Sequence, residues 1–306
     1  MTRCEQGSTA TPQFSVIIPV YNDWIPLERC LRSLARQTNP PVFEVIAVDD
    51  GSAEAAPEST RSAEYPFLLT TVRQAHSGIP SARNLGIRNS KGTVLLFVDA
   101  DCRLEANCLL ALSEAMARAP QHDCFQLRLV GDRATLVGRA EELRLATFQR
   151  MRLEPDDRIR YLNTAGFAIR RRRVEAGEVF HPGALRGEDT LLLADLMQAG
   201  ELPLFVADAV VEHSIPLSLM KCLRKDLRSV YLEGPAYDMI ASRGLKIRLT
   251  QWERLRLLGS MWRVAGRDSL GRSAWFVVVI RQAFQRVASF GYRYVRRGSG
   301  RMRGQL

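Results

Sequence analysis

The chain has 306 residues, 46% of them hydrophobic and 25% charged, which is an ordinary composition for a globular protein with a core. The net charge of +10 is concentrated after Pro216, where Arg and Lys far outnumber Asp and Glu. Such an excess suits nucleic acid, anionic lipid or a phosphorylated substrate. The sequence has no helix-turn-helix, zinc-finger or RNA-binding aromatic motif, so we expect no nucleic-acid partner.

The cysteines and the N-terminus both indicate a reducing, cytoplasmic location. The six cysteines form no C-x-x-C pair and no metal-type spacing, which predicts free, mostly buried thiols. The first residues, MTRCEQGSTATPQ, lack the apolar core of a signal peptide. The longest apolar run near the C-terminus, residues 274–280, is far shorter than the roughly 20 residues that span a bilayer. We therefore expect no transmembrane helix.

Apolar runs and helical periodicity alternate through the first two thirds of the chain. The expected strands are 14–20, 43–48, 67–72, 93–98, 162–169 and 204–212. The expected helices are 27–34, 80–90, 105–118 and 190–199, with a charged, helix-like stretch at 141–160. Strands that alternate with helices predict an α/β fold, with a mostly parallel sheet flanked by helices.

The pattern changes after Pro216, where helices expected at 217–232, 251–265 and 274–295 are rich in Arg. We therefore divide the chain into four regions. They are a disordered N-terminus at 1–12, an α/β domain at 13–215, a basic helical region at 216–295 and a disordered tail at 296–306.

The stretch LLFVDADCRLE, residues 95–105, ends a buried strand in two carboxylates. Alternate side chains of an extended chain point the same way, so Asp99 and Asp101 could share one face at the end of the strand. Two neighbouring acids repel each other unless a cation lies between them. By itself the stretch is either a cation site or a solvated loop.

Three further polar stretches follow an expected strand or begin an expected helix: PVYN at 19–22, DDGS at 49–52 and GED at 187–189. Each alone also suits a turn or a helix cap. Because ligands of parallel sheets bind beyond the carboxyl ends of the strands, we expect these stretches to meet. Arg83, in SARN, could contact a phosphate there or lie on a solvated helix face.

Across roughly residues 14–215, the stretches PVYN, VDDGS, GIPSARNLGI, GTVLLFVDADC and GEDTLLLADLMQAG resemble glycosyltransferase family 2 in their order and spacing. The resemblance implies the GT-A fold, which is Rossmann-like. It also implies an inverting enzyme that uses a nucleoside-diphosphate (NDP) sugar, with a UDP-sugar preferred, and Mn²⁺ or Mg²⁺.

The resemblance also implies roles for particular positions. The nucleotide-sugar would contact Pro19, Tyr21, Asn22, Asp49, Asp50, Gly51, Arg83, Asn84, Asp99 and Ala100. Either Asp49 or Asp50 would hold the base, with a slight preference for Asp49. Asp189, with Glu188 beside it, would be the catalytic general base.

The metal would be bound by Asp101, with Asp99 close to both ribose and metal. His213 follows the expected strand 204–212 and is either a further metal ligand or a residue that caps the strand end. His76 and His181 are expected to be loop residues. Family members often carry DADD where this chain has DADC, and we expect Cys102 to pack in the interior.

The chemistry explains these residue types. A hard divalent cation stabilises the charge that grows on the departing diphosphate. A carboxylate must take the proton of the attacking hydroxyl, and a single base opposite the leaving group gives inversion in one displacement. A retaining hydrolase would instead need two acids astride the bond.

The acceptor is expected to be a glycan, a glycolipid or a lipid-linked intermediate. The sequence lacks a Q-x-x-R-W motif after Asp189, which favours transfer of a single sugar over polymerisation. In the C-terminal region, Arg286 and Arg293 alternate with Phe284, Val287 and Phe290. This pattern suits a helix on the anionic inner face of the membrane, or a subdomain packed on the catalytic domain.

Two other functions remain open. A nucleotidyltransferase on a similar scaffold would usually carry a Gly- and Lys-rich phosphate loop after the first strand, and PVYNDW is not one. An inactive nucleotide-sugar-binding scaffold would need neither Asp101 nor Asp189.

Overall fold

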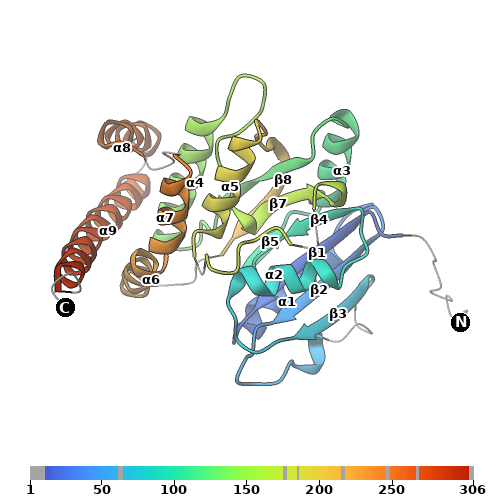
Figure 1. The fold of residues 1–306 in the computed structure, drawn as a ribbon. Helices are drawn as coiled ribbons and strands as arrows, with labels where there is room; N and C mark the ends of the chain where they lie inside the picture. The colour runs from blue at the N-terminus through green and yellow to red at the C-terminus, as the bar shows by residue number, and fades with distance from the viewer. Residues whose placement is uncertain are drawn as a thin grey trace, which may run out of the picture.

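The computed structural model describes residues 11–60, 65–174, 178–184, 186–214, 218–244, 249–266 and 269–302 (Figure 1). Most of the expected N-terminal segment, residues 1–10, lies outside this range. An eight-stranded sheet, in the order β3-β2-β1-β4-β7-β6-β8-β5, forms the centre of the molecule. Its strands are β1 (Phe14–Val20), β2 (Phe43–Asp49), β3 (Leu68–Arg73), β4 (Val94–Phe97), β5 (Cys102–Leu104), β6 (Cys124–Gly131), β7 (Phe167–Arg170) and β8 (Leu204–His213).

The sheet has a parallel half and a mixed half. Strands β3, β2, β1 and β4 pair in parallel, as the alternation of strands and helices predicts. Strand β7 runs antiparallel to both β4 and β6, and β5 runs antiparallel to β8, while β6 and β8 pair in parallel. The prediction of an α/β fold is confirmed, and the antiparallel pairs are confined to the second half.

Helices cover both faces of the sheet and continue beyond it. They are α1 (Trp24–Ala35), α2 (Ile79–Arg88), α3 (Cys108–Arg118), α4 (Leu136–Arg152), α5 (Glu188–Gln198), α6 (Leu219–Leu232), α7 (Gly234–Ser242), α8 (Gln251–Ala265) and α9 (Ser269–Met302). Single-turn 3-10 helices lie at Glu58–Thr60, Thr164–Gly166 and Arg171–Arg173. Side chains of α1, α3 and α4 share one core, and those of α2 and α5 share the other.

Strand β1 is buried on both faces. Val16 and Ile18 belong to the core beside α1, whereas Ile17 points into the core beside α2. Helix α2 approaches β1 closely because Gly86 has no side chain: a Cβ there would lie 2.4 Å from Ile17 Cγ2. This close packing fixes the start of α2, which carries Arg83, beyond the carboxyl ends of β1 and β2.

Several elements differ from the expectations. Strands β5 and β6 and helix α7 were not predicted. Strand β5 has only three residues, whereas the alternation of apolar and polar side chains in β6 was a strand signal that was missed. The stretch expected to be helical to 160 leaves the helix at Arg152, since Pro155 cannot continue one. The strand expected at 162–169 is limited to Phe167–Arg170.

Helix α9 runs to Met302, past the point at 296 where the sequence suggests a disordered tail. Once a helix is nucleated by packing, each further residue adds a hydrogen bond, so a polar end can remain helical. Among the described helices, α9 included, none is both long and apolar enough to cross a membrane. Five cysteines are free and buried as predicted, while Cys4 lies outside the described residues.

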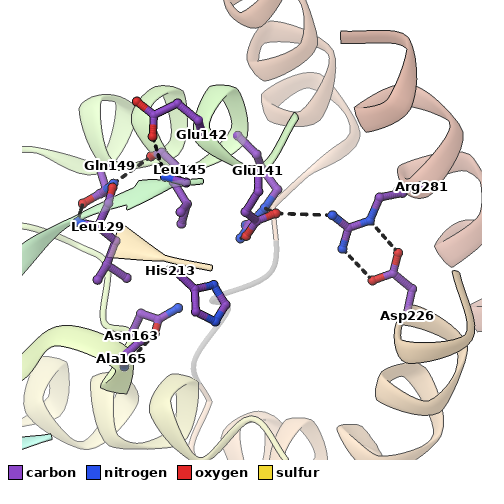
Figure 2. Close-up of polar contacts among 12 residues, drawn as sticks. Leu129, Glu141, Glu142, Leu145, Gln149, Asn163, Ala165, His213, Asp226 and Arg281 are labelled. Atoms are coloured by element: carbon purple, nitrogen blue, oxygen red, sulfur yellow. Dashed lines mark hydrogen bonds and ion pairs between the residues drawn. The ribbon is translucent and has the colours of Figure 1, made fainter. Parts of the chain in front are cut away.

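Helices α8 and α9 pack on the rest of the molecule through α4, whereas α7 packs on α5. Leu145 of α4 belongs to the core beside the sheet, whereas Leu143 packs against Met261 of α8 and Val278 of α9. Figure 2 shows a buried ion-pair network at the same junction. Its members are Arg281 of α9, Asp226 of α6 and Glu141 of α4.

Candidate active site

The ends of β1 and β2 form one corner of the site with the loop that follows β3. Asp49 accepts a hydrogen bond from the Ser52 backbone N–H at 2.8 Å and pairs with Arg73 at 3.1 Å. Asp50 accepts bonds from the backbone N–H groups of Ser77 and Gly78, each at 2.9 Å. Both carboxylates are therefore engaged in shaping this corner.

A glycine is required between these acids and the loop. Gly51 has φ +80°, and a Cβ at this position would lie 2.8 Å from the backbone nitrogen of His76. The close approach brings His76 beside Tyr21, so that their rings stack with centroids 4.2 Å apart. Tyr21 is 45% exposed, which leaves it open to a planar partner such as a nucleobase. Pro19, at the end of β1, is partly buried nearby in the chain.

His76 lies in the loop after β3, as expected, but its contacts were not foreseen. Its Nδ1 lies 2.9 Å from an Asp50 carboxylate oxygen. His181 matches that expectation better, since its Nδ1 accepts a bond from the Gly183 N–H in its own turn. The sequence signal that could have indicated His76 was its place after a third parallel strand.

Two asparagines with expected nucleotide contacts form side-chain hydrogen bonds to the backbone of neighbouring loops. Asn84 is buried and bonds the backbone of Val179 and Phe180 through both ends of its amide. Asn22 accepts a bond from the Ala53 N–H at 2.8 Å through its side chain. Both amides therefore stabilise loops around the site, and that of Asn84 has little capacity left for a ligand.

The DAD stretch meets His213 through strand pairing. In the antiparallel register of β5 and β8, Cys102 lies opposite His213. The Ser214 N–H donates to the Asp101 carbonyl at 3.0 Å, and His213 Nε2 lies 3.3 Å from Asp101 Oδ1. Ala100, between the two acids, is buried. This pairing brings together two motifs that are far apart in the sequence.

Asp101, Cys102 and His213 offer ligand atoms within 4.8 Å of one another. A carboxylate oxygen and an imidazole nitrogen suit Mn²⁺, and the carboxylate alone suits Mg²⁺, so the residues fit such an ion. Burial beside Asp101 and Asp99 holds the pKa of the Cys102 thiol well above its usual range. A neutral, buried thiol is a poor ligand for a hard cation, so we assign Cys102 to packing, as expected.

Charges around Asp101 favour its ionised form. Burial would raise the pKa of this carboxyl, but the His213 imidazole and the Lys225 ammonium outweigh it and lower the pKa. Lys225 belongs to α6, so the charge of this C-terminal helix acts on a carboxylate of the DAD stretch.

Arg83 connects the DAD stretch to the GED stretch. Its guanidinium is 1% exposed and donates to Glu188 Oε1 at 2.6 Å and to Asp99 Oδ1 at 2.7 Å. Burial works against the charge, yet the two carboxylates raise the pKa of Arg83 above its usual value. The alternative of a solvated helix face is wrong. By binding both carboxylates, Arg83 fixes the distance between Asp99 of the DAD stretch and Glu188 of the GED stretch.

Asp189 differs from its neighbour Glu188. Glu188 is buried and paired with Arg83, whereas Asp189 is partly buried and accepts a hydrogen bond from its neighbour, the Thr190 N–H, at 2.6 Å. Burial, and after it the charge of Glu188, raises the pKa of Asp189 to about 7. A carboxylate with a pKa near neutrality is suited to accept a proton from an alcohol.

The fold is an α/β fold in which polar side chains gather at the carboxyl ends of parallel strands, beside a candidate divalent-cation site. The family model "Glycosyl transferase family 2" matches residues 15–176 of the chain. The chain therefore belongs to glycosyltransferase family 2, as its motifs suggested.

Curated relatives align over about a third of this chain. Glycosyltransferase AglE of Haloferax volcanii is 39% identical over 98 residues, which are 31% of this chain and 32% of AglE. Validoxylamine A glucosyltransferase of Streptomyces hygroscopicus subsp. limoneus is 41% identical over 97 residues, or 30% and 21% of the two chains. The matched segment spans about a third or less of the length of these relatives.

Solved structures match over nearly the whole chain. Mannosyltransferase PcManGT from Pyrobaculum calidifontis, solved with GDP-Man and Mn²⁺, has a TM-score of 0.60 at 19% identity and covers 92% of this chain and 87% of its own. S. aureus TarS 1-349, solved with UDP-GlcNAc, has a TM-score of 0.54 at 17% identity and covers 92% of both chains. At these identities the likeness establishes the fold, which is the predicted GT-A fold.

Proposed function

We propose that the chain transfers a single sugar from an NDP-sugar, preferably a UDP-sugar, to a hydroxyl of a glycan, glycolipid or lipid-linked acceptor, with inversion. The proposal rests on the presence of two features in the same site. One is the Asp101–His213 pair, with 3.3 Å between the carboxylate and the imidazole. The other is Asp189, a carboxyl with a pKa raised to about 7.

Asp189 would act as the general base. Its deprotonated carboxylate takes the proton of the acceptor hydroxyl as the oxygen attacks the sugar carbon, and the bond to the diphosphate breaks on the opposite side. Glu188 is held by Arg83, so Asp189 is the member of the pair that is available for this proton. One base and no nucleophilic carboxylate give a single displacement with inversion.

The donor would bind across the strand ends. Tyr21, exposed and stacked on His76, would receive the nucleobase, while Asp49 and Asp50 shape the corner that holds it. Asp101 and His213 would hold Mn²⁺ or Mg²⁺, which when bound stabilises the charge of the departing diphosphate. PcManGT was solved with Mn²⁺, as was GalNAc-T7 with UDP and GalNAc, which supports a divalent cation.

The relatives suggest the class of the acceptor. One of them, 36% identical over 102 residues, is the poly(ribitol-phosphate) beta-glucosyltransferase of Bacillus spizizenii. A cell-envelope glycan or its lipid-linked precursor is thus a reasonable acceptor. We place the protein in the cytoplasm at the inner face of the membrane, which agrees with its free cysteines.

The test is to incubate the protein with Mn²⁺ and a panel of NDP-sugars and to measure NDP release, with Asp189→Asn as the matched control. We expect slow hydrolysis or transfer with one donor, lost in the variant. Pyrophosphate formed from an NTP and a sugar phosphate would instead identify a nucleotidyltransferase. Donor binding without turnover, even with candidate acceptors present, would identify an inactive scaffold.

A further inference from the structure

The outward side of α9 carries an apolar stripe that the described part of the chain leaves exposed. Its members are spaced by three or four residues and therefore lie on one side of the helix. The large ones are 47–73% exposed: Phe276, Ile280, Val287 and Phe290, with the exposed Ala283 between them. The opposite side of the helix is the one that packs, through Val278 and the paired Arg281.

Helix α8 carries a second stripe of the same kind. Trp252 is 77% exposed, Leu255 54% and Trp262 40%, at positions that again repeat every three or seven residues. The Trp262 ring contacts Trp275 of α9 at 4.9 Å between centroids, and Trp275 contacts Phe276 at 5.2 Å. The two stripes are thereby joined. We call the exposed side chains of α8 and α9 together the outer face.

Arginines provide most of the charge of α8 and α9, in which Glu253 is the single acidic residue. Helix α9 contains no Asp or Glu along its length, whereas Arg272 and Arg286 are exposed beside its stripe. Arg272 lies over the Trp262 ring, 5.9 Å from its centroid. On α8, Arg256 and Arg263 are also exposed. In Figure 1, α8 and α9 lie at one end of the molecule, outside α4, so the domain core leaves this side open.

Two exposed tryptophans, apolar stripes and a border of arginines match the chemistry of a bilayer interface, where Trp sits at the headgroup level and Arg meets lipid phosphate. A second copy of the chain would bring the same arginines against each other, which disfavours self-association through this face. We propose that the outer face docks on an anionic lipid bilayer, with α9 lying along the surface.

This docking adds to the proposed function a partner that does not take part in the reaction. It would hold the site close to a lipid-linked acceptor. Helix α9 is joined to α6 by the Arg281–Asp226 ion pair. Helix α6 also carries Lys225, whose charge lowers the pKa of Asp101. The test below contains no sugar donor, so its result is independent of whether the chain is active.

The full-length protein is sedimented at low salt with vesicles of phosphatidylcholine alone, or mixed with an equal amount of phosphatidylglycerol. Val287→Glu adds one charge to the outer face. Val42→Glu makes the same change at another exposed valine, 54% exposed, in the loop before β2. Circular dichroism and gel filtration of each variant report folding and oligomeric state.

We expect the wild type and Val42→Glu to sediment with the anionic vesicles and less with pure phosphatidylcholine. Val287→Glu should partition about tenfold more weakly, because burying a valine contributes about one such factor to binding. The proposal is overturned if the wild type stays in the supernatant, or if both variants behave alike. It is also overturned if the protein forms a dimer that Val287→Glu dissociates while vesicles bind none of the three proteins.

Discussion

Replacing Arg281 by alanine removes the residue that ties α9 to α6 and α4. Its guanidinium donates to both carboxylate oxygens of Asp226, at 2.8 and 2.9 Å, and to Glu141 at 3.3 Å (Figure 2). Both carboxylates are only 4% exposed. The variant therefore leaves buried negative charge behind, and the magnitude depends on which acid keeps a partner.

Glu141 keeps one. It remains paired with Arg144 through two contacts, and burial opposed by Arg144 and Arg281 leaves the pKa of Glu141 below its usual range. Asp226 has no other ion pair among the described residues, so its unpaired carboxylate dominates the cost. Breaking one buried pair costs about 3–5 kcal/mol, and we expect the lower end because one of the two acids stays compensated.

The assay is urea unfolding followed by circular dichroism, with Arg286→Ala as the control on the same helix. Arg286 is exposed, so that variant should change the free energy of unfolding by less than about 0.5 kcal/mol. Arg281→Met combined with Asp226→Leu should recover most of the loss, since no charge is then left unpaired. The reasoning is refuted if Arg281→Ala is as stable as Arg286→Ala, or if the double variant is no more stable than Arg281→Ala.

Further predictions concern three residues of the site. Asp189 must lose its proton to act, so kcat/KM should rise with pH through about 7, and Asp189→Asn should abolish turnover at every pH. The same raised pKa favours the protonated form on folding, so wild-type stability should fall from about pH 4 to about pH 7 in urea titrations, and Asp189→Asn should flatten this slope. Arg83→Ala should lower stability by about 3 kcal/mol and reduce kcat, because Asp99 and Glu188 lose their shared partner; a fully active, stable variant would contradict this. Tyr21→Ala should raise the donor KM about tenfold or more with little change in kcat, because a base stacked on a ring contributes about 1–3 kcal/mol. An unchanged KM would remove Tyr21 from the base site.

The strand ends could be predicted from the sequence because they depend on local patterns. The apolar runs of β1, β2 and β4 stop at PVYN, DDGS and DAD, and parallel pairing brings these ends together. The helical spacing of α1, α2 and α8 is equally local, and these helices lie close to where they were expected. The order and spacing of five such motifs then indicated glycosyltransferase family 2, which the family model confirms.

The rest depends on contacts between distant segments. His213 reaches Asp101 only because β5, a three-residue strand, pairs with β8 in one register. Arg83 has two possible roles in the sequence, and its burial between Asp99 and Glu188 excludes the solvated helix face. Asn84 has the residue type of a ligand contact, yet its amide is used by the backbone of Val179 and Phe180. Local periodicity contains no information on such pairings.

The measurement that tests the account most directly is calorimetric titration of nucleoside diphosphates, UDP first, with Mn²⁺ and with EDTA in its place. We predict that wild type binds one nucleoside diphosphate markedly more tightly with Mn²⁺, and that Asp101→Ala loses this metal dependence. Asp99→Ala should keep the metal dependence at lower affinity. Equal affinity with and without metal in the wild type, or equal and metal-independent losses in both variants, would contradict a diphosphate held through a cation at this edge of the sheet.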